Sequence, residues 1–152
     1  MAKIAIVSDS TGCIPAEELK ALDIHVNYIS IVFGTESYRE FIDMTPEEFM
    51  ERCENYSGLP TTSQPSPGST MELYESLFAQ GYEDIIHINI SSQLSGSHQT
   101  AKTCAEMVNP EHIHVFLCIT YFRSFKLFSY YILFRFFISF FNKGSFYNFG
   151  IV

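Results

Sequence analysis

Residues 3–12 read KIAIVSDSTG, a short apolar run that passes directly into polar turn residues. A run bounded in this way is typical of a buried β-strand, which we place over residues 3–7. Proline at position 15 suits the start of a helix and two glutamates follow it, so a helix from Pro15 to Leu22 is predicted next. A buried strand that leads at once into a helix is the expected opening unit of an α/β sheet.

The chain continues this alternation of strands and helices. Further strands are predicted over 24–33, 84–90 and 112–117. Helices are predicted from Pro46 to about Asn55, from Pro67 to a cap at Gly81, and from Ser95 as N-cap to a stop at Asn109-Pro110, with a polar loop over 56–67. The fold class is therefore α/β, with a mostly parallel sheet flanked by helices. Ligands bind such sheets at the carboxyl ends of the strands, where serine-rich loops follow residues 7 and 90.

Charge is unevenly distributed along the chain. The net charge of −8 disfavours nucleic acid as a partner, because nucleic-acid binders carry a basic face. All 17 acidic residues lie at or before Glu111 against five basic ones, so this part carries 5 − 17 = −12. The remaining four basic residues follow Cys118 and give +4. The net charge thus changes sign near the boundary that we predict between a domain over 1–116 and a tail over 117–152.

The tail differs in kind from the domain. From Phe116 onward the chain holds eleven of its 15 phenylalanines, with neither a helical nor an alternating pattern. A membrane-spanning helix needs about 20 mostly apolar residues, and four basic residues interrupt the run here. Phe, Tyr, Ile, Asn and Lys are the residues that AT-rich codons specify. We therefore favour an aberrant, frameshift-derived tail over a membrane anchor, and we expect it to be poorly ordered.

Cysteine spacing and the N-terminus give two further expectations. The four cysteines form no C-x-x-C pair, so no metal site and no thioredoxin-type site are predicted, and no cofactor is implied. The opening residues MAKIAIV do not resemble a signal peptide. A cytoplasmic protein with reduced thiols is the simplest interpretation.

Two polar clusters are candidates for a site. Residues 59–67 read LPTTSQPSP, in which prolines stiffen a segment rich in hydroxyls. Residues 91–101 read SSQLSGSHQTA, where a strand end, serines and a glycine precede a helix, an arrangement that favours an anion. Judged on the residues alone, an ordinary loop with a helix cap explains each cluster at least as well.

A family resemblance bears on this choice. IVSDST at 6–11, TTSQPSPG at 61–68 and SSQLSGSHQTA at 91–101 together resemble the DegV family of bacterial fatty-acid-binding proteins. The resemblance covers residues 3 to about 116 and implies the N-terminal domain of a two-domain fold. In that family the acyl chain lies in an apolar tunnel between the domains, and hydroxyls and a backbone N–H hold the carboxylate.

Specific residues follow from the resemblance by motif. It implies that Thr62 and Ser95 hold the carboxylate, with Thr61 and the N–H of Gly96 as secondary contacts. It implies a long-chain fatty acid such as hexadecanoate as ligand and the catalytic subunit of a fatty acid kinase as partner. The chain itself is then not an enzyme, and any membrane contact is transient.

The sequence departs from the family in two places. Ser97 and His98 stand where the family commonly has Thr-Tyr, and we expect His98 to face solvent. The second domain is replaced by the tail, which predicts a truncated protein with impaired lipid binding. Two alternative functions are a hydrolase built on Ser95 and His98, for which no G-x-S-x-G elbow is present, and a phosphotransfer domain, for which no P-loop is present.

Overall fold

The computed structural model describes residues 2–117, so the predictions for the tail lie outside the described residues apart from Leu117. Within this range a 3-10 turn, η1, spans Ser10–Gly12. The helices are α1 Ala16–Ala21, α2 Pro46–Asn55, α3 Pro67–Ala79 and α4 Ser97–Val108. The strands are β1 Ile4–Asp9, β2 Ile24–Asn27, β3 Ser30–Phe33, β4 Glu36–Arg39, β5 Thr61–Ser63, β6 Asp84–Asn89 and β7 Ile113–Leu117.

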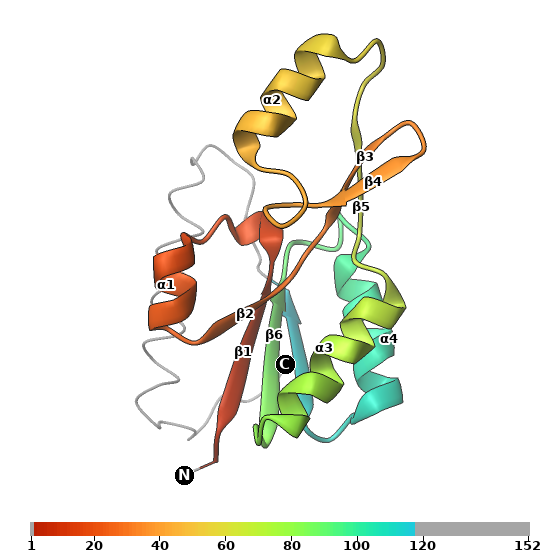
Figure 1. The fold of residues 1–152 in the computed structure, drawn as a ribbon. Helices are drawn as coiled ribbons and strands as arrows, with labels where there is room; N and C mark the ends of the chain where they lie inside the picture. The colour runs from red at the N-terminus through yellow and green to blue at the C-terminus, as the bar shows by residue number, and fades with distance from the viewer. Residues whose placement is uncertain (1, 118–152) are drawn as a thin grey trace. The chain divides into compact units, whose positions relative to one another are not determined.

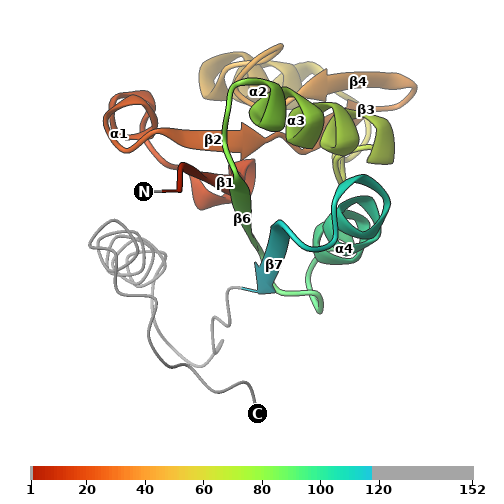
Figure 2. The same ribbon diagram turned by 90° about the horizontal axis from the view of Figure 1, so that it is seen from below.

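Four of the strands form a parallel sheet, which we call sheet A. Its order is β2-β1-β6-β7, and every neighbouring pair runs parallel. Helix α1 lies on one side of this sheet, and α3 and α4 lie on the other (Figures 1 and 2). The predicted fold class, an α/β fold with a parallel sheet flanked by helices, is confirmed.

The main core lies between sheet A and helices α3 and α4. Its fully buried members include Val7 on β1, Leu77 on α3, Ile85 on β6 and Cys104 on α4. Strands β1 and β6 are buried along all but their first residue, as central parallel strands covered on both faces require. This burial explains why apolar residues follow one another without alternation at 4–7 in β1 and at 85–86 in β6.

The predicted strand over 24–33 is wrong as a single element. The chain leaves sheet A after Asn27 and starts a new strand, β3, at Ser30. Between the two strands the Ile29 N–H donates to Ser10 Oγ at 3.1 Å, which holds the change of direction. Alternation continues across the break, so periodicity alone could not reveal that the strand changes its partners.

A second, smaller sheet was not predicted. In this sheet B, antiparallel strands lie in the order β4-β3-β5. Strand β5 falls inside the predicted polar loop over 56–67, and all three of its residues are exposed. Helix α2 packs on sheet B through Phe49, which contacts a small cluster of Ile31, Phe33 and Met44.

Helices α2 and α3 both begin with a side-chain cap. Thr45 and Glu48 form the complete capping box that starts α2, and Ser66 caps α3 by accepting the Ser69 N–H. Gly81 follows α3 with a φ of +85°, the left-handed conformation that glycine adopts without strain. None of the helices within 2–117 is long and apolar enough to cross a bilayer.

Candidate functional site

The carboxyl ends of β1 and β6 meet at Asp9, which is buried. Its Oδ2 accepts the Ile90 N–H at 2.7 Å, and its Oδ1 accepts the Thr11 hydroxyl. Burial raises the pKa of the Asp9 carboxyl, and the bonds from Thr11 and Ile90 oppose that rise. Asp9 thus fixes the first residue of the serine-rich loop after β6. This role of Asp9 was not predicted from the sequence, because its partner Ile90 lies 81 positions away.

Ser95 lies in the loop between β6 and α4, next to a buried serine. Its Oγ accepts the Ser97 N–H at 3.2 Å and lies 2.8 Å from the Ser97 Oγ. The predicted N-cap is wrong by one residue, because Gly96 occupies that position. Ser95 nevertheless satisfies one of the free N–H groups at the start of the helix. Because the Ser97 hydroxyl can donate to Ser95 Oγ, the Ser95 proton can point to a ligand.

Gly96 lies against the side chain of Gln64, which comes from the other polar cluster. A Cβ on Gly96 would stand 1.9 Å from Gln64 Oε1, closer than any real Cβ contact. Gln64 Nε2 donates to Thr100 Oγ1 in the first turn of α4 at 2.7 Å, across 36 residues of sequence. The structure therefore brings together the two clusters that the sequence singled out.

Thr61 and Thr62 are consecutive residues of β5, and both line a cavity of about 340 Å³. Thr62 pairs with Ile31, and Thr61 with Val32, of β3. Within residues 2–117 the hydroxyls of these two threonines make no hydrogen bond, and both side chains are exposed. The cavity wall is mostly apolar and includes Ile31, Phe41, Met44, Phe49 and Pro60, with the carboxylate of Glu40 as an exception.

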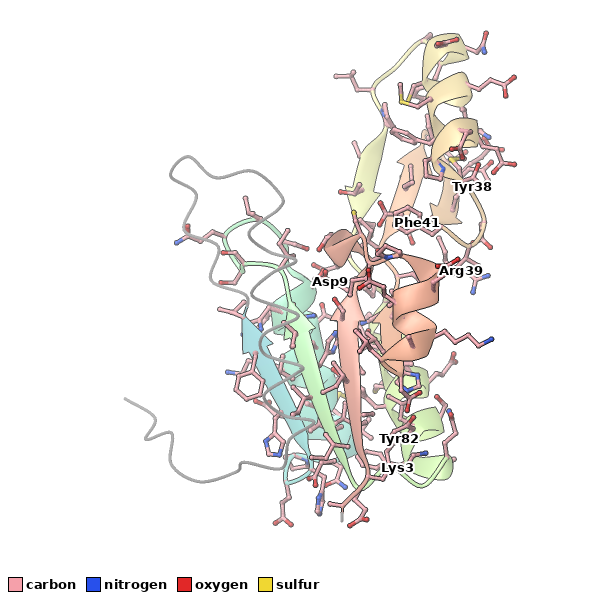
Figure 3. All side chains as sticks on the ribbon, turned by 90° about the vertical axis from the view of Figure 1, so that its left-hand side faces the viewer. Lys3, Asp9, Tyr38, Arg39, Phe41 and Tyr82 are labelled. Atoms are coloured by element: carbon pink, nitrogen blue, oxygen red, sulfur yellow. The ribbon has the colours of Figure 1, made fainter. Side chains whose placement is uncertain are left out.

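Phe41 separates this cavity from a second one of about 440 Å³ that includes Asp9, Ser10 and Ile14 in its wall. Phe41 belongs to both walls and has a φ of +62°, which is strained for a bulky side chain. Its N–H donates to the Met44 carbonyl at 3.1 Å, which holds this conformation. Figure 3 shows Phe41 beside Asp9, above the end of β1.

A buried polar network lies below this edge of sheet A. His87 Nδ1 is 2.6 Å from the Tyr74 hydroxyl, and His87 Nε2 is 2.9 Å from Asn89 Nδ2. Complete burial lowers the pKa of His87 to about 3, and burial raises the pKa of Tyr74. The histidine is therefore neutral at physiological pH, and its two ring nitrogens connect Tyr74 and Asn89 inside the core.

His98 is half-buried, which corrects the expectation that it faces solvent. Its Nδ1 is buried and has no hydrogen-bond partner among the described residues. Burial lowers the pKa of His98, with a smaller contribution from the positive charge of Lys102. Within 2–117 no hydrogen bond joins His98 to Ser95, whose Oγ contacts Ser97 instead. No group of metal-ligating side chains occurs in this range either.

These features define an α/β domain whose polar site lies at the carboxyl edge of a parallel sheet. The family described as "Uncharacterised protein, DegV family" matches residues 3–126, and the chain belongs to the DegV family. A DegV domain-containing protein of Halalkalibacterium halodurans is 42% identical over 108 residues, which are 71% of this chain and 38% of that protein.

Solved structures show the same relationship. DegV of Bacillus subtilis, a fatty-acid-binding protein, is 38% identical with a TM-score of 0.69, over 76% of this chain and 40% of that one. A stearic-acid-binding protein of Eubacterium ventriosum is 26% identical with a TM-score of 0.77, over 96% of this chain and 50% of that one. The chain thus spans about 40% of the length of the curated relative and about half or less of these structures.

Proposed function

We propose that this chain binds the carboxylate of a long-chain fatty acid such as hexadecanoate, through the hydroxyls of Thr62 and Ser95. Thr61 and the N–H of Gly96 provide secondary contacts. The acyl chain lies on the apolar wall of the cavity beside β5. The chain acts without catalysis, in the cytoplasm, by presenting the fatty acid to a separate kinase subunit.

One observation carries the proposal. The cluster that holds Thr61 and Thr62 contacts the cluster that holds Ser95 and Gly96, through the Gln64–Thr100 hydrogen bond. The two threonine hydroxyls are free of other hydrogen bonds within the described range, so they are available to a ligand. The fatty-acid binding of the Bacillus subtilis relative supports the same choice of ligand.

The chemistry of the site suits a carboxylate. Hydrogen bonds to a charged group each contribute about 1.5–3 kcal/mol, so a few hydroxyls and an N–H hold the head group without a buried cation. The positive end of the α4 dipole adds to this attraction. Each buried methylene contributes about 0.8 kcal/mol, so the acyl chain dominates the affinity while the hydroxyls select the head group.

Binding of hexadecanoate to the 152-residue chain tests the proposal. Isothermal titration calorimetry on the wild type, Thr62→Ala and Ser95→Ala should show affinity losses of roughly ten- to hundredfold for each variant. Ser92→Ala is the matched control, since this exposed loop serine lies outside the proposed contacts. Equal affinities for all four proteins, or no uptake of hexadecanoate by the wild type, would contradict the proposal.

A further inference from the structure

We propose that Gln64 is a positioning residue that locks the two halves of the carboxylate site to each other. This inference rests on the proposed function, because it concerns how Thr62 and Ser95 are kept at a fixed separation. Thr62 belongs to sheet B and Ser95 to a loop of sheet A, and the two sheets share no strand. A ligand that needs both hydroxyls therefore requires a connection close to them, in addition to the Ile29–Ser10 hydrogen bond that holds the chain between β2 and β3.

Gln64 provides that connection from a constrained backbone. It follows β5 directly and precedes the buried Pro65, whose ring restricts the conformation of the residue before it. The next residue, Ser66, caps α3, so the segment is held at both ends. The backbone that carries the exposed carboxamide is therefore held in place beside α4.

The carboxamide reaches α4 with both of its polar atoms. Nε2 donates to Thr100 Oγ1, and Oε1 lies over the Cα of Gly96. The 1.9 Å separation from a Cβ at that place means that only glycine permits this approach. Gly96 and Gln64 are therefore a matched pair. A side chain at 96 would displace the carboxamide and break the Gln64–Thr100 hydrogen bond that links the end of β5 to α4.

The carboxamide also lies beside the N-terminus of α4, where the proposed carboxylate is held. An uncharged side chain at position 64 is compatible with a ligand anion there, whereas glutamate of the same shape is not. Two like charges about 6 Å apart at an intermediate dielectric repel enough to lower affinity about tenfold. A purely structural role for Gln64 would not produce a difference between charged and uncharged ligands.

The experiment uses the full 152-residue chain with hexadecanoate and, as an uncharged ligand, hexadecan-1-ol. Gln64→Glu should lose about tenfold in affinity for hexadecanoate and keep its affinity for the alcohol. Gln99→Ala, an exposed glutamine in the first turn of α4, is the matched control and should change neither. Equal losses for both ligands in Gln64→Glu, or none for either, would overturn the inference.

A double-mutant cycle tests the pairing of Gln64 with Gly96. Gly96→Ala should weaken hexadecanoate binding about fivefold in the wild type and less than about twofold in Gln64→Ala, because the clash is then absent. An equal loss in both backgrounds would overturn the inference.

The same cycle measured on the denaturation midpoint of the ligand-free chain separates the two hypotheses. If the wild type takes up no hexadecanoate but Gly96→Ala lowers the midpoint only when Gln64 is present, the proposed function fails and the Gln64–Gly96 pairing stands. If the wild type binds hexadecanoate and the cycle shows no coupling by either measurement, the positioning role fails and the proposed function stands.

Discussion

Sheets A and B differ in how their strands are held. The central strands of sheet A are buried on both faces, and β1 and β6 pair over five residues. In sheet B, β5 is wholly exposed and pairs with β3 over three residues. The core of this sheet is a cluster of only three buried side chains among the described residues. Sheet A is therefore the scaffold, and sheet B is the weaker part that carries Thr61 and Thr62. The scaffold and the two threonines of the proposed site therefore lie in different sheets, so mutations should separate stability from the contribution of Thr61 and Thr62 to binding.

The largest effect is expected from Leu77→Ala, which removes a fully buried side chain beneath sheet A. A cavity at such a site costs about 2–5 kcal/mol of unfolding free energy. Urea denaturation followed by circular dichroism measures this loss. Leu59→Ala is the control, because Leu59 is 89% exposed and should change stability by less than about 0.5 kcal/mol. Similar losses in both variants would mean that the core beneath sheet A is not the scaffold.

Acid should act on sheet A through His87. Its pKa falls from an ordinary 6.5 to about 3, so between these pH values the unfolded chain binds a proton that the native chain does not. The stabilisation that neutral His87 gives to the native chain is fully present above pH 6.5. It is lost as the pH falls toward 3, which lowers the free energy of unfolding by roughly a few kcal/mol in total. Denaturation midpoints measured at several pH values show the slope.

His87→Gln removes this titration and should flatten the slope, although the variant starts from a lower stability at pH 7. Gln99→Ala, at an exposed position that carries no titratable group, should keep the slope of the wild type. An unchanged slope in His87→Gln would assign the acid sensitivity to other groups.

A smaller and local effect is expected from Thr45→Ala. This change removes the capping box of α2, which packs on sheet B, at a cost of about 1 kcal/mol. Hydrogen exchange should speed up in α2 and in β3, β4 and β5 but not in β1 or β6. Thr35→Ala, in the exposed turn between β3 and β4, is the matched control. Faster exchange throughout sheet A would show that the two sheets unfold as one unit.

The smallest expected effect concerns binding rather than stability. Glu40 contributes to the cavity beside Thr61 and Thr62, and its Oε2 is buried without a hydrogen-bond partner among residues 2–117. Glu40→Gln removes a negative charge near the proposed carboxylate, so hexadecanoate should bind about two- to fivefold more tightly. Glu47→Gln, on the exposed side of α2, should leave the affinity unchanged. Weaker binding in Glu40→Gln would place the carboxylate elsewhere.

The difference between the sheets also explains what the sequence could predict. Local apolar runs predicted strands β1 and β6, and alternation predicted β2. Pro46 and Pro67 marked the starts of two helices. Strands β4 and β5 carry no such pattern, because they are short and exposed and their pairing is set by distant residues. Ser95 and Thr62 were named through a family resemblance rather than through chemistry visible in the residues. The contact between Gln64 and Gly96 joins segments far apart in sequence, and no local pattern encodes it.

Strand β1 has a consequence for how the domain forms during synthesis. Ile4 lies opposite Asp84, so 84 − 4 = 80 positions separate this strand from its partner on that side. At about 5–20 residues per second, a ribosome needs about 4–16 seconds to make the intervening segment. Throughout that time one edge of β1 has no partner. Synonymous codons between the two strands should therefore change the nascent chain's exposure to aggregation while leaving the finished fold unaltered.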